Sequence, residues 1–161
     1  MLYPDERLGQ RAQPRAVDDG LLTIGRRLLE AAKAANAYGL AAVHMGAVAP
    51  VVVISAASDP AKREYVVLYN PETLTVAEET AAGPEGSVSM PGAEAQIVRP
   101  VWADVAYDDE AGQRQTQRFE GLPARIALHE IEQVNGVFFL DRLSRLKRDM
   151  VIKKWRKRAA D

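Results

Sequence analysis

The chain has 161 residues, of which 47% are hydrophobic and 27% are charged, and its formal net charge is −1 at pH 7. This is the balance of an ordinary globular protein, and the length suits one domain with a single core. No apolar run is long enough to span a bilayer, and no basic segment followed by an apolar one opens the chain. We therefore expect a cytoplasmic protein. The absence of cysteine excludes disulfides and thiolate metal ligands.

The small net charge hides an uneven distribution of charge along the chain. The segment from Arg142 to Arg158 holds nine basic residues and one acidic residue, Asp149, so it carries +8 and leaves −9 for the remainder. A basic end on an acidic body favours electrostatic contact with a polyanion. A solvated helix face would have the same composition, so both readings stay open.

The first predicted element is a helix from about residue 20 to residue 35, capped by Asp18 and Asp19. Its apolar residues recur at helical spacing and would face the core: Leu21, Ile24, Leu28, Ala32 and Ala35. Gly39 follows, where a helix would end.

The middle of the chain predicts strands and turns. In chain order, we expect strands at 51–54 and 65–69, the latter closed by Asn70-Pro71, an irregular segment at 81–86, strands at 96–98 and 101–107, a hairpin loop at 108–112 and a returning strand at 114–119. Pro123 suits the first turn of a second helix, which should run to about Asn135 and end at Gly136. A strand-like segment at 137–140 precedes a third helix that begins near Ser144. Strands clustered between helices indicate an α+β domain.

Three motifs stand out, in a fixed order. Residues 38–44 read YGLAAVH, residues 85–91 read EGSVSMP, and residues 129–136 read HEIEQVNG. They resemble the motifs GxGLAAxQ, EGCLSxP and HExDHLxG of the peptide deformylases. Residues 4–8 and 136–144 also match that family, so the resemblance covers nearly the whole chain.

The resemblance implies a fold and an activity. It implies a single domain over 1–161, with mixed or antiparallel sheets around a central helix that carries the HExxQ sequence, and a basic C-terminal helix at 143–160. The family hydrolyses the formyl group of N-formylmethionyl peptides. A divalent iron or zinc ion, held by one cysteine and two histidines, activates a water molecule.

At the metal-ligand positions, the resemblance places Ser87 where the family has cysteine, His129 at the first histidine and Gln133 at the second. An alcohol stays protonated near neutral pH, and an amide oxygen is a weak ligand for iron or zinc. We therefore expect no metal in the family's geometry. Zinc or iron(II) would require a rebuilt site made by His44, His129 and one of Gln133, Glu130 or Ser87.

At the catalytic positions, Glu130 keeps the place of the general acid and base. His44 replaces the family's glutamine, and the backbone N–H of Val88 would complete the oxyanion site. A different reading makes Ser87 a nucleophile that is activated by His129 or His44 and oriented by Glu130.

The substrate pocket implied by the resemblance contains Tyr38, Gly39, Leu40 and Arg125. Arg125 falls where the family usually has an apolar residue that lines the methionine pocket, so it would bind a carboxylate or point to solvent. Glu85 and Arg99 occupy positions that form a structural ion pair in the family.

Two functions from different classes follow. The first is a protein that lacks normal deformylase activity and keeps a binding role, for a peptide N-terminus or for the ribosome surface. The basic helix would serve the ribosome, with an apolar stripe docked on the body: Leu143, Leu146, Met150, Val151 and Trp155. The second is a metal-dependent hydrolase that removes formyl, or opens a related amide, through the rebuilt site. We expect no DNA or membrane partner.

Overall fold

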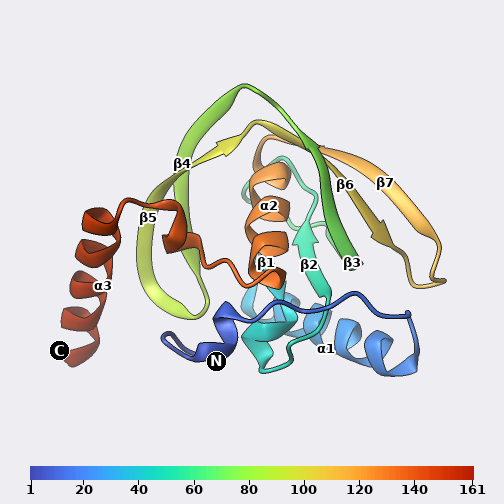
Figure 1. Ribbon diagram of the computed structural model, residues 1–161, viewed down its shortest axis with the longest axis horizontal. Coiled ribbons are helices and arrows are strands. Elements are labelled where there is room, and N and C mark those ends of the chain that lie inside the picture. Colours follow the sequence, from blue (N-terminus) through green and yellow to red (C-terminus); the bar gives the residue numbers. More distant parts are fainter.

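Two antiparallel sheets enclose one helix, α2, in the computed structural model, which describes residues 1–161 (Figure 1). The helices and strands are α1 (Asp19–Ala35), β1 (Gly39–Ala41), β2 (Val51–Ser55), β3 (Tyr65–Val76), β4 (Thr80–Ser87), β5 (Met90–Pro100), β6 (Trp102–Asp108), β7 (Arg114–Glu120), α2 (Leu122–Val134) and α3 (Arg145–Ala160). Three short 3-10 helices cover Glu6–Gly9, Ala42–Met45 and Phe139–Arg142. The predicted α+β class is confirmed.

The larger sheet has the strand order β1-β2-β3-β6-β7, and the smaller one pairs β4 with β5. Every pairing is antiparallel. Helix α2 lies between the two sheets, and the chain passes from β3 to β4 in an arch above it (Figure 1). The β4–β5 pair therefore faces α2 from the side opposite to β6 and β7.

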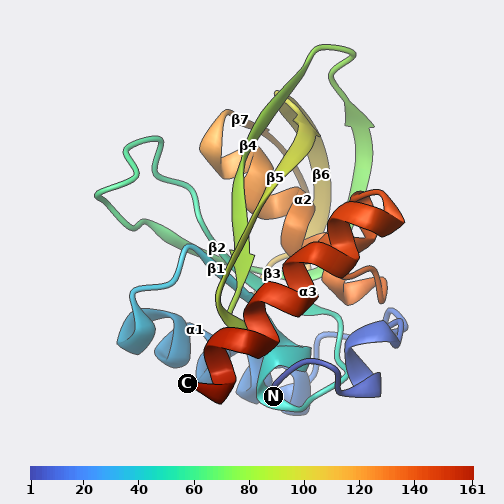
Figure 2. The same ribbon diagram turned by 90° about the vertical axis from the view of Figure 1, so that its left-hand side faces the viewer.

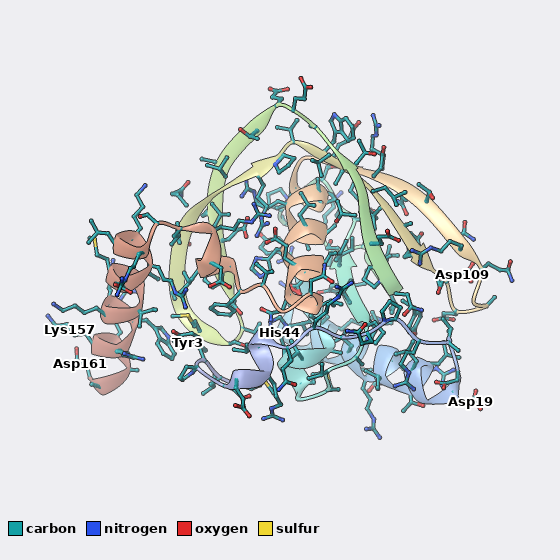
Figure 3. All side chains as sticks on the ribbon, viewed as in Figure 1. Tyr3, Asp19, His44, Asp109, Lys157 and Asp161 are labelled. Atoms are coloured by element: carbon teal, nitrogen blue, oxygen red, sulfur yellow. The ribbon has the colours of Figure 1, made fainter.

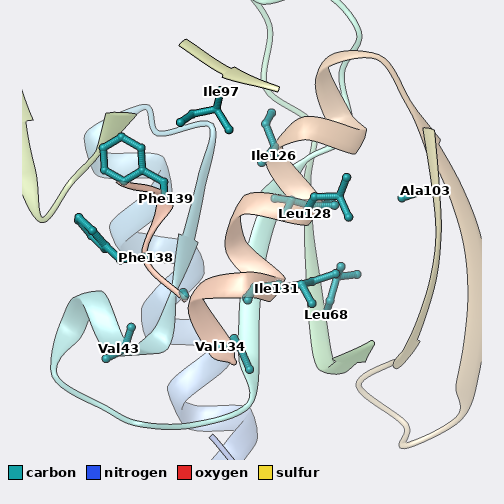
Figure 4. Close-up of a cluster of buried hydrophobic side chains, with 14 of the residues drawn as sticks. Val43, Leu68, Ile97, Ala103, Ile126, Leu128, Ile131, Val134, Phe138 and Phe139 are labelled. Atoms are coloured by element: carbon teal, nitrogen blue, oxygen red, sulfur yellow. The ribbon is translucent and has the colours of Figure 1, made fainter. Parts of the chain in front are cut away.

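Helix α2 occupies the centre, and nine of its thirteen residues are buried, as expected for a helix surrounded by other elements. Ile126, Leu128 and Ile131 lie in the main core (Figure 4). Gly136 ends the helix with φ of +79°, as predicted. A Cβ atom at this position would lie 2.6 Å from the Gly9 carbonyl oxygen, so the N-terminal segment passes directly over the end of α2.

Helix α1 begins as predicted, because the Asp18 side chain accepts a hydrogen bond of 2.8 Å from the Leu21 backbone N–H. The helix ends at Ala35, as predicted, but Gly39 takes no part in ending it. Asn36 ends the helix in the left-handed conformation, with φ of +49°, and Gly39 begins β1. Asparagine tolerates this conformation better than most side chains, so it replaces the glycine we expected.

Three predictions for the strands are wrong. Strand β3 continues through Asn70 and Pro71, because a register shift accommodates the proline and the Asn70 side chain bonds Arg15 and Asp108. The segment 81–86 is the body of β4, which buries only alternate residues and so carries little apolar signal. The segment 137–140 forms no strand and instead enters the last 3-10 helix.

Helix α3 packs on the outer side of β5 (Figure 2). Trp155 Nε1 donates to the Pro91 carbonyl oxygen at 3.1 Å, and Arg158 donates to that of Gly92 at 3.2 Å. The predicted apolar stripe is wrong at Leu146 and Met150, which are 72% and 62% exposed. The helix docks along the adjacent face, through Val151, Ile152 and Trp155. None of the helices has both the length and the apolar character needed to cross a membrane.

Candidate functional site

A cleft of about 1020 Å³ lies between the β4–β5 pair and α2. Most of the residues that the motifs singled out line it: Tyr38, Gly39, His44, Ser87, Val88, Arg125, His129 and Glu130. His44 sits near the foot of α2 (Figure 3). Two predicted site residues, Leu40 and Gln133, do not line the cleft. Leu40 packs instead in the second core cluster, beside α1.

Glu85 is the most heavily bonded group of the site. Its Oε2 accepts from Arg99 Nε at 2.8 Å and from Arg125 Nη1 at 2.7 Å, and its Oε1 lies 2.9 Å from Arg99 Nη2 and 2.8 Å from His129 Nδ1. The predicted pair of Glu85 and Arg99 is thus confirmed. Burial alone would raise the pKa of Glu85, but the hydrogen bonds from His129 and Arg99 outweigh it and lower that pKa to about 2.

Arg125 turns inward and binds a carboxylate of its own chain. Besides Glu85, it donates to the Ile97 carbonyl oxygen at 2.7 Å and to that of Ala81 at 2.8 Å. The side chain is only 15% exposed. Arg125 therefore ties α2 to both strands of the smaller sheet, and its guanidinium forms part of the cleft wall.

His129 is oriented by Glu85. Because Glu85 is ionised, the hydrogen on this contact belongs to His129 Nδ1, and Nε2 is left to face Glu130 Oε1 at 3.5 Å. Burial lowers the pKa of His129, but the bond to Glu85 and the nearby Glu130 outweigh this and raise it. Burial also raises the pKa of Glu130 to about 7. Both shifts favour the protonated forms of these two facing side chains.

His44 is held in one tautomer. Its Nδ1 accepts a hydrogen bond of 3.0 Å from the Ala41 backbone N–H, so this nitrogen carries no hydrogen. Burial lowers the pKa of His44 to about 3, and the ring is neutral with its hydrogen on Nε2. That Nε2–H is buried and has no partner in the protein.

The other two ligand positions are engaged elsewhere. Gln133 Nε2 donates to the Leu8 carbonyl oxygen at 2.7 Å, and the side chain is buried beneath the N-terminal segment. Ser87 Oγ accepts from the Ser89 backbone N–H at 3.1 Å, and no hydrogen bond joins it to either histidine. The contact that a nucleophilic Ser87 would need is therefore not made.

These donors do not fit the family's divalent metal. Only His129 offers a nitrogen lone pair in the cleft, because the lone pair of His44 is committed to Ala41. No three His, Asp or Glu side chains converge in a group that could hold a metal ion. The neutral hydroxyl of Ser87 and the amide of Gln133 would add little to the metal affinity of the single imidazole of His129.

Sequence reasoning missed several contributors to the cleft, among them Pro91 and Gly92. Pro91 and Gly92 form part of its wall while their carbonyl oxygens are held by α3 from behind. Pro91 closes the second motif, so its place near the cleft could have been inferred. Nothing local in the sequence indicates that Trp155 and Arg158 support it.

Comparison with known proteins gives consistent results. The family of polypeptide deformylases matches residues 1–149. A peptide deformylase of Agrobacterium fabrum is 38% identical over 160 residues, which is 99% of this chain and 94% of that one. A peptide deformylase-like protein of Bradyrhizobium diazoefficiens is 40% identical over 156 residues, which is 96% of this chain and 90% of that one.

Solved structures agree with the sequence matches. The crystal structure of peptide deformylase from Ehrlichia chaffeensis has a TM-score of 0.88 at 29% identity and covers 99% of this chain and 95% of its own. That of a peptide deformylase from Legionella pneumophila has a TM-score of 0.87 at 34% identity, with 99% and 94% covered. From fold, motifs and sequence together, the chain belongs to the polypeptide deformylase family.

Proposed function

We propose that this family member does not carry out metal-dependent deformylation and instead binds a peptide N-terminus in the cleft. The observation that carries the proposal is the engagement of the ligand positions: Gln133 bonds Leu8, Ser87 bonds Ser89, and His44 keeps its hydrogen on Nε2. One imidazole remains, and one is too few to hold a zinc or iron(II) ion tightly.

The preserved architecture of the cleft supports a binding role. The buried contacts among Glu85, Arg99 and Arg125 hold α2 and the smaller sheet on either side of a large open space. A cleft of this size, lined by apolar and polar side chains, can accept a peptide end. Binding would then depend on hydrogen bonds and burial of apolar surface.

One experiment separates this proposal from a rebuilt metal site. Metal content and hydrolysis of formyl-Met-Ala-Ser are measured on one anaerobic preparation, beside the triple variant Ser87→Cys, Gln133→His, His44→Gln. We expect the wild type to hold no stoichiometric metal and to show no turnover, and the variant to gain both. Zinc or iron(II) in the wild type, with turnover, would mean that His44 and His129 have formed a new site, and the hydrolase would be the correct assignment.

A second candidate role concerns α3. Its cations point outward, and Leu146 and Met150 are exposed between them. We propose that this surface contacts the ribosome, in the cytoplasm, through RNA phosphates. Co-sedimentation of the full chain with ribosomes should weaken steeply with added salt. A chain that ends at Ser144 should no longer co-sediment, and equal co-sedimentation of both chains would exclude this role.

A further inference from the structure

We propose that Arg125 makes the wall of the cleft a subsite for a carboxylate group, which an acidic side chain of the bound peptide supplies. Aspartate or glutamate near the N-terminus of the ligand is the source we expect. The inference rests on the proposed binding function and names the class of peptide that the cleft prefers.

Contacts with β4 and β5 hold the Arg125 guanidinium in place. It donates at 2.7 Å to Glu85 Oε2, at 2.7 Å to the Ile97 carbonyl oxygen and at 2.8 Å to that of Ala81. Gly83 lets the group lie close to β4, because a Cβ atom at that position would be 3.0 Å from Arg125 Cζ and 3.1 Å from Nε. The side chain is therefore ordered before a ligand arrives, which lowers the entropy cost of binding.

The guanidinium keeps hydrogen-bond donors for a ligand. An arginine side chain has five N–H groups. The bonds to Glu85 and Ile97 use both hydrogens of Nη1, and the bond to Ala81 uses one of Nη2, so one N–H of Nη2 and that of Nε remain. The side chain lines the cleft and is 15% exposed, so a group bound in the cleft can reach it. Two N–H groups on one guanidinium match the two oxygens of a carboxylate.

The charges around Arg125 favour an anion. One connected set of ion pairs holds three arginines but only two carboxylates: Arg99, Arg125 and Arg142 with Glu85 and Glu132. Each carboxylate is shared by two arginines, so Arg125 has no carboxylate to itself, and the set keeps one positive charge. A cationic side chain of a ligand would add to this surplus charge, whereas a carboxylate would neutralise it.

Two other carboxyl groups line the cleft, and neither takes the place of a ligand at Arg125. Glu130 faces the two histidines, 3.5 Å from His129 and 4.0 Å from His44. Glu94 lies at an exposed position of β5, where solvent screens its charge. The open donors of Arg125 are therefore left for a group that comes with the ligand.

Nuclear magnetic resonance of protein labelled with ¹⁵N-arginine, at constant ionic strength, tests the subsite directly. Acetate should shift the Nε–H signal of Arg125 in a saturable way, and acetamide, which has a similar shape without the charge, should bind at least about tenfold more weakly. Arg118 is the matched control, because its Nε and Nη2 already bond Asp104 at 2.7 and 2.9 Å, and its signal should not move. Equal shifts at the two arginines, or no saturable shift at Arg125, would overturn the subsite.

Peptide binding tests the source of the carboxylate. Three tripeptide amides carry glutamate at the first, second or third position among alanines, and each has a glutamine counterpart, so the glutamate side chain is the only carboxylate. By calorimetry, at least one glutamate peptide should bind about tenfold tighter than its counterpart, and the difference should shrink with added salt. Equal affinities in all three pairs would reject the acidic preference and keep the proposed function. A response of Arg125 to acetate without binding of any peptide would do the reverse.

Two variants make the result specific. Arg125→Met removes the donors and should abolish the preference for glutamate, whereas Arg125→Lys keeps the charge without the paired donors and should retain only part of it. Each variant also identifies the Arg125 signal by its loss. The ¹⁵N backbone spectrum of each variant shows whether it is folded. If neither is folded, the comparison of glutamate with glutamine peptides on the wild type still decides.

Discussion

Arg125 and Glu85 are joined by an ion pair of 2.7 Å that connects α2 to β4 across the wall of the cleft. The same guanidinium also holds carbonyl oxygens of β4 and β5. Arg125→Leu should therefore reduce the free energy of unfolding by about 2 kcal/mol, because it leaves two carbonyl oxygens unpaired while Arg99 still neutralises Glu85. Urea unfolding measures this loss.

A matched control is available on the surface. Arg118 makes a two-bond pair with Asp104, but its side chain is half exposed. Arg118→Leu should change the stability far less, since exposed pairs contribute little. Comparable losses at the two positions would mean that the bonds of Arg125 in the cleft wall contribute no more to stability than an exposed ion pair does.

Acid unfolding should report on Glu85. Its pKa is about 2 in the folded protein against an ordinary value of 4.5, so its stabilisation is complete above about pH 4.5 and is lost as the pH falls towards 2. The difference corresponds to about 3 kcal/mol. Glu85→Gln should flatten the dependence of stability on pH in this range. An equally steep loss of stability at acid pH in that variant would mean that other carboxylates cause the loss.

Glu130 should have the opposite effect on how stability depends on pH. Burial raises its pKa to about 7, so between about pH 4.5 and pH 7 the folded state holds a proton that the unfolded chain has lost. Stability should therefore decrease as the pH rises through this window. The raised pKa of His129 should continue the decrease above about pH 6.5, where the unfolded chain loses the proton of this histidine first. Thermal unfolding of wild type and Glu130→Gln at several pH values checks this. The variant should lose most of the slope.

Gly25 should tolerate no side chain, although it lies within a helix. A Cβ atom there would lie 2.2 Å from Tyr69 Oη, so Gly25→Ala should reduce stability by about 1–3 kcal/mol. Gly20, in the same helix, has no atom closer than 3.4 Å, and Gly20→Ala should stabilise by about 0.5–1 kcal/mol. Tyr69→Phe removes a buried, unpaired hydroxyl and should relieve part of the clash in the double variant.

Trp155 should stabilise the cleft wall at Pro91 and Gly92, although it lies outside the cleft. Trp155→Phe keeps an aromatic ring beside Tyr3 but removes the N–H that holds the Pro91 carbonyl oxygen. Amide hydrogen exchange at Gly92 and at its neighbours in β5 should become faster. Leu146→Ala, on the exposed side of the same helix, is the control and should change nothing there.

Local patterns predicted the elements that local forces determine. The Asp18 cap, the apolar run of β2, Gly136 and the start of α3 at Ser144 are all confirmed. Strand β4 was missed because five of its eight residues are exposed and its two buried residues are Gly83 and Glu85, which give no apolar periodicity. Its place is determined by pairing with β5 and by contacts with α2, which no short window of sequence contains.

For the candidate site, too, the sequence predicted some features and missed others. The motifs predicted which residues would gather in the cleft, because each residue keeps its place on a helix or strand. They could not give the partner of Arg125, which lies 40 residues away, or the hydrogen bond that fixes the tautomer of His44. Leu40 and Gln133 were assigned to the site by position, but their side chains point into the protein.

The bond between Gln133 and the Leu8 carbonyl oxygen also constrains any redesign of the cleft. Gln133→His alone would remove the partner of a buried carbonyl and would not by itself complete a metal site. A redesign that installs the family's ligands must therefore supply a new donor for Leu8 if the N-terminal segment is to stay anchored to α2.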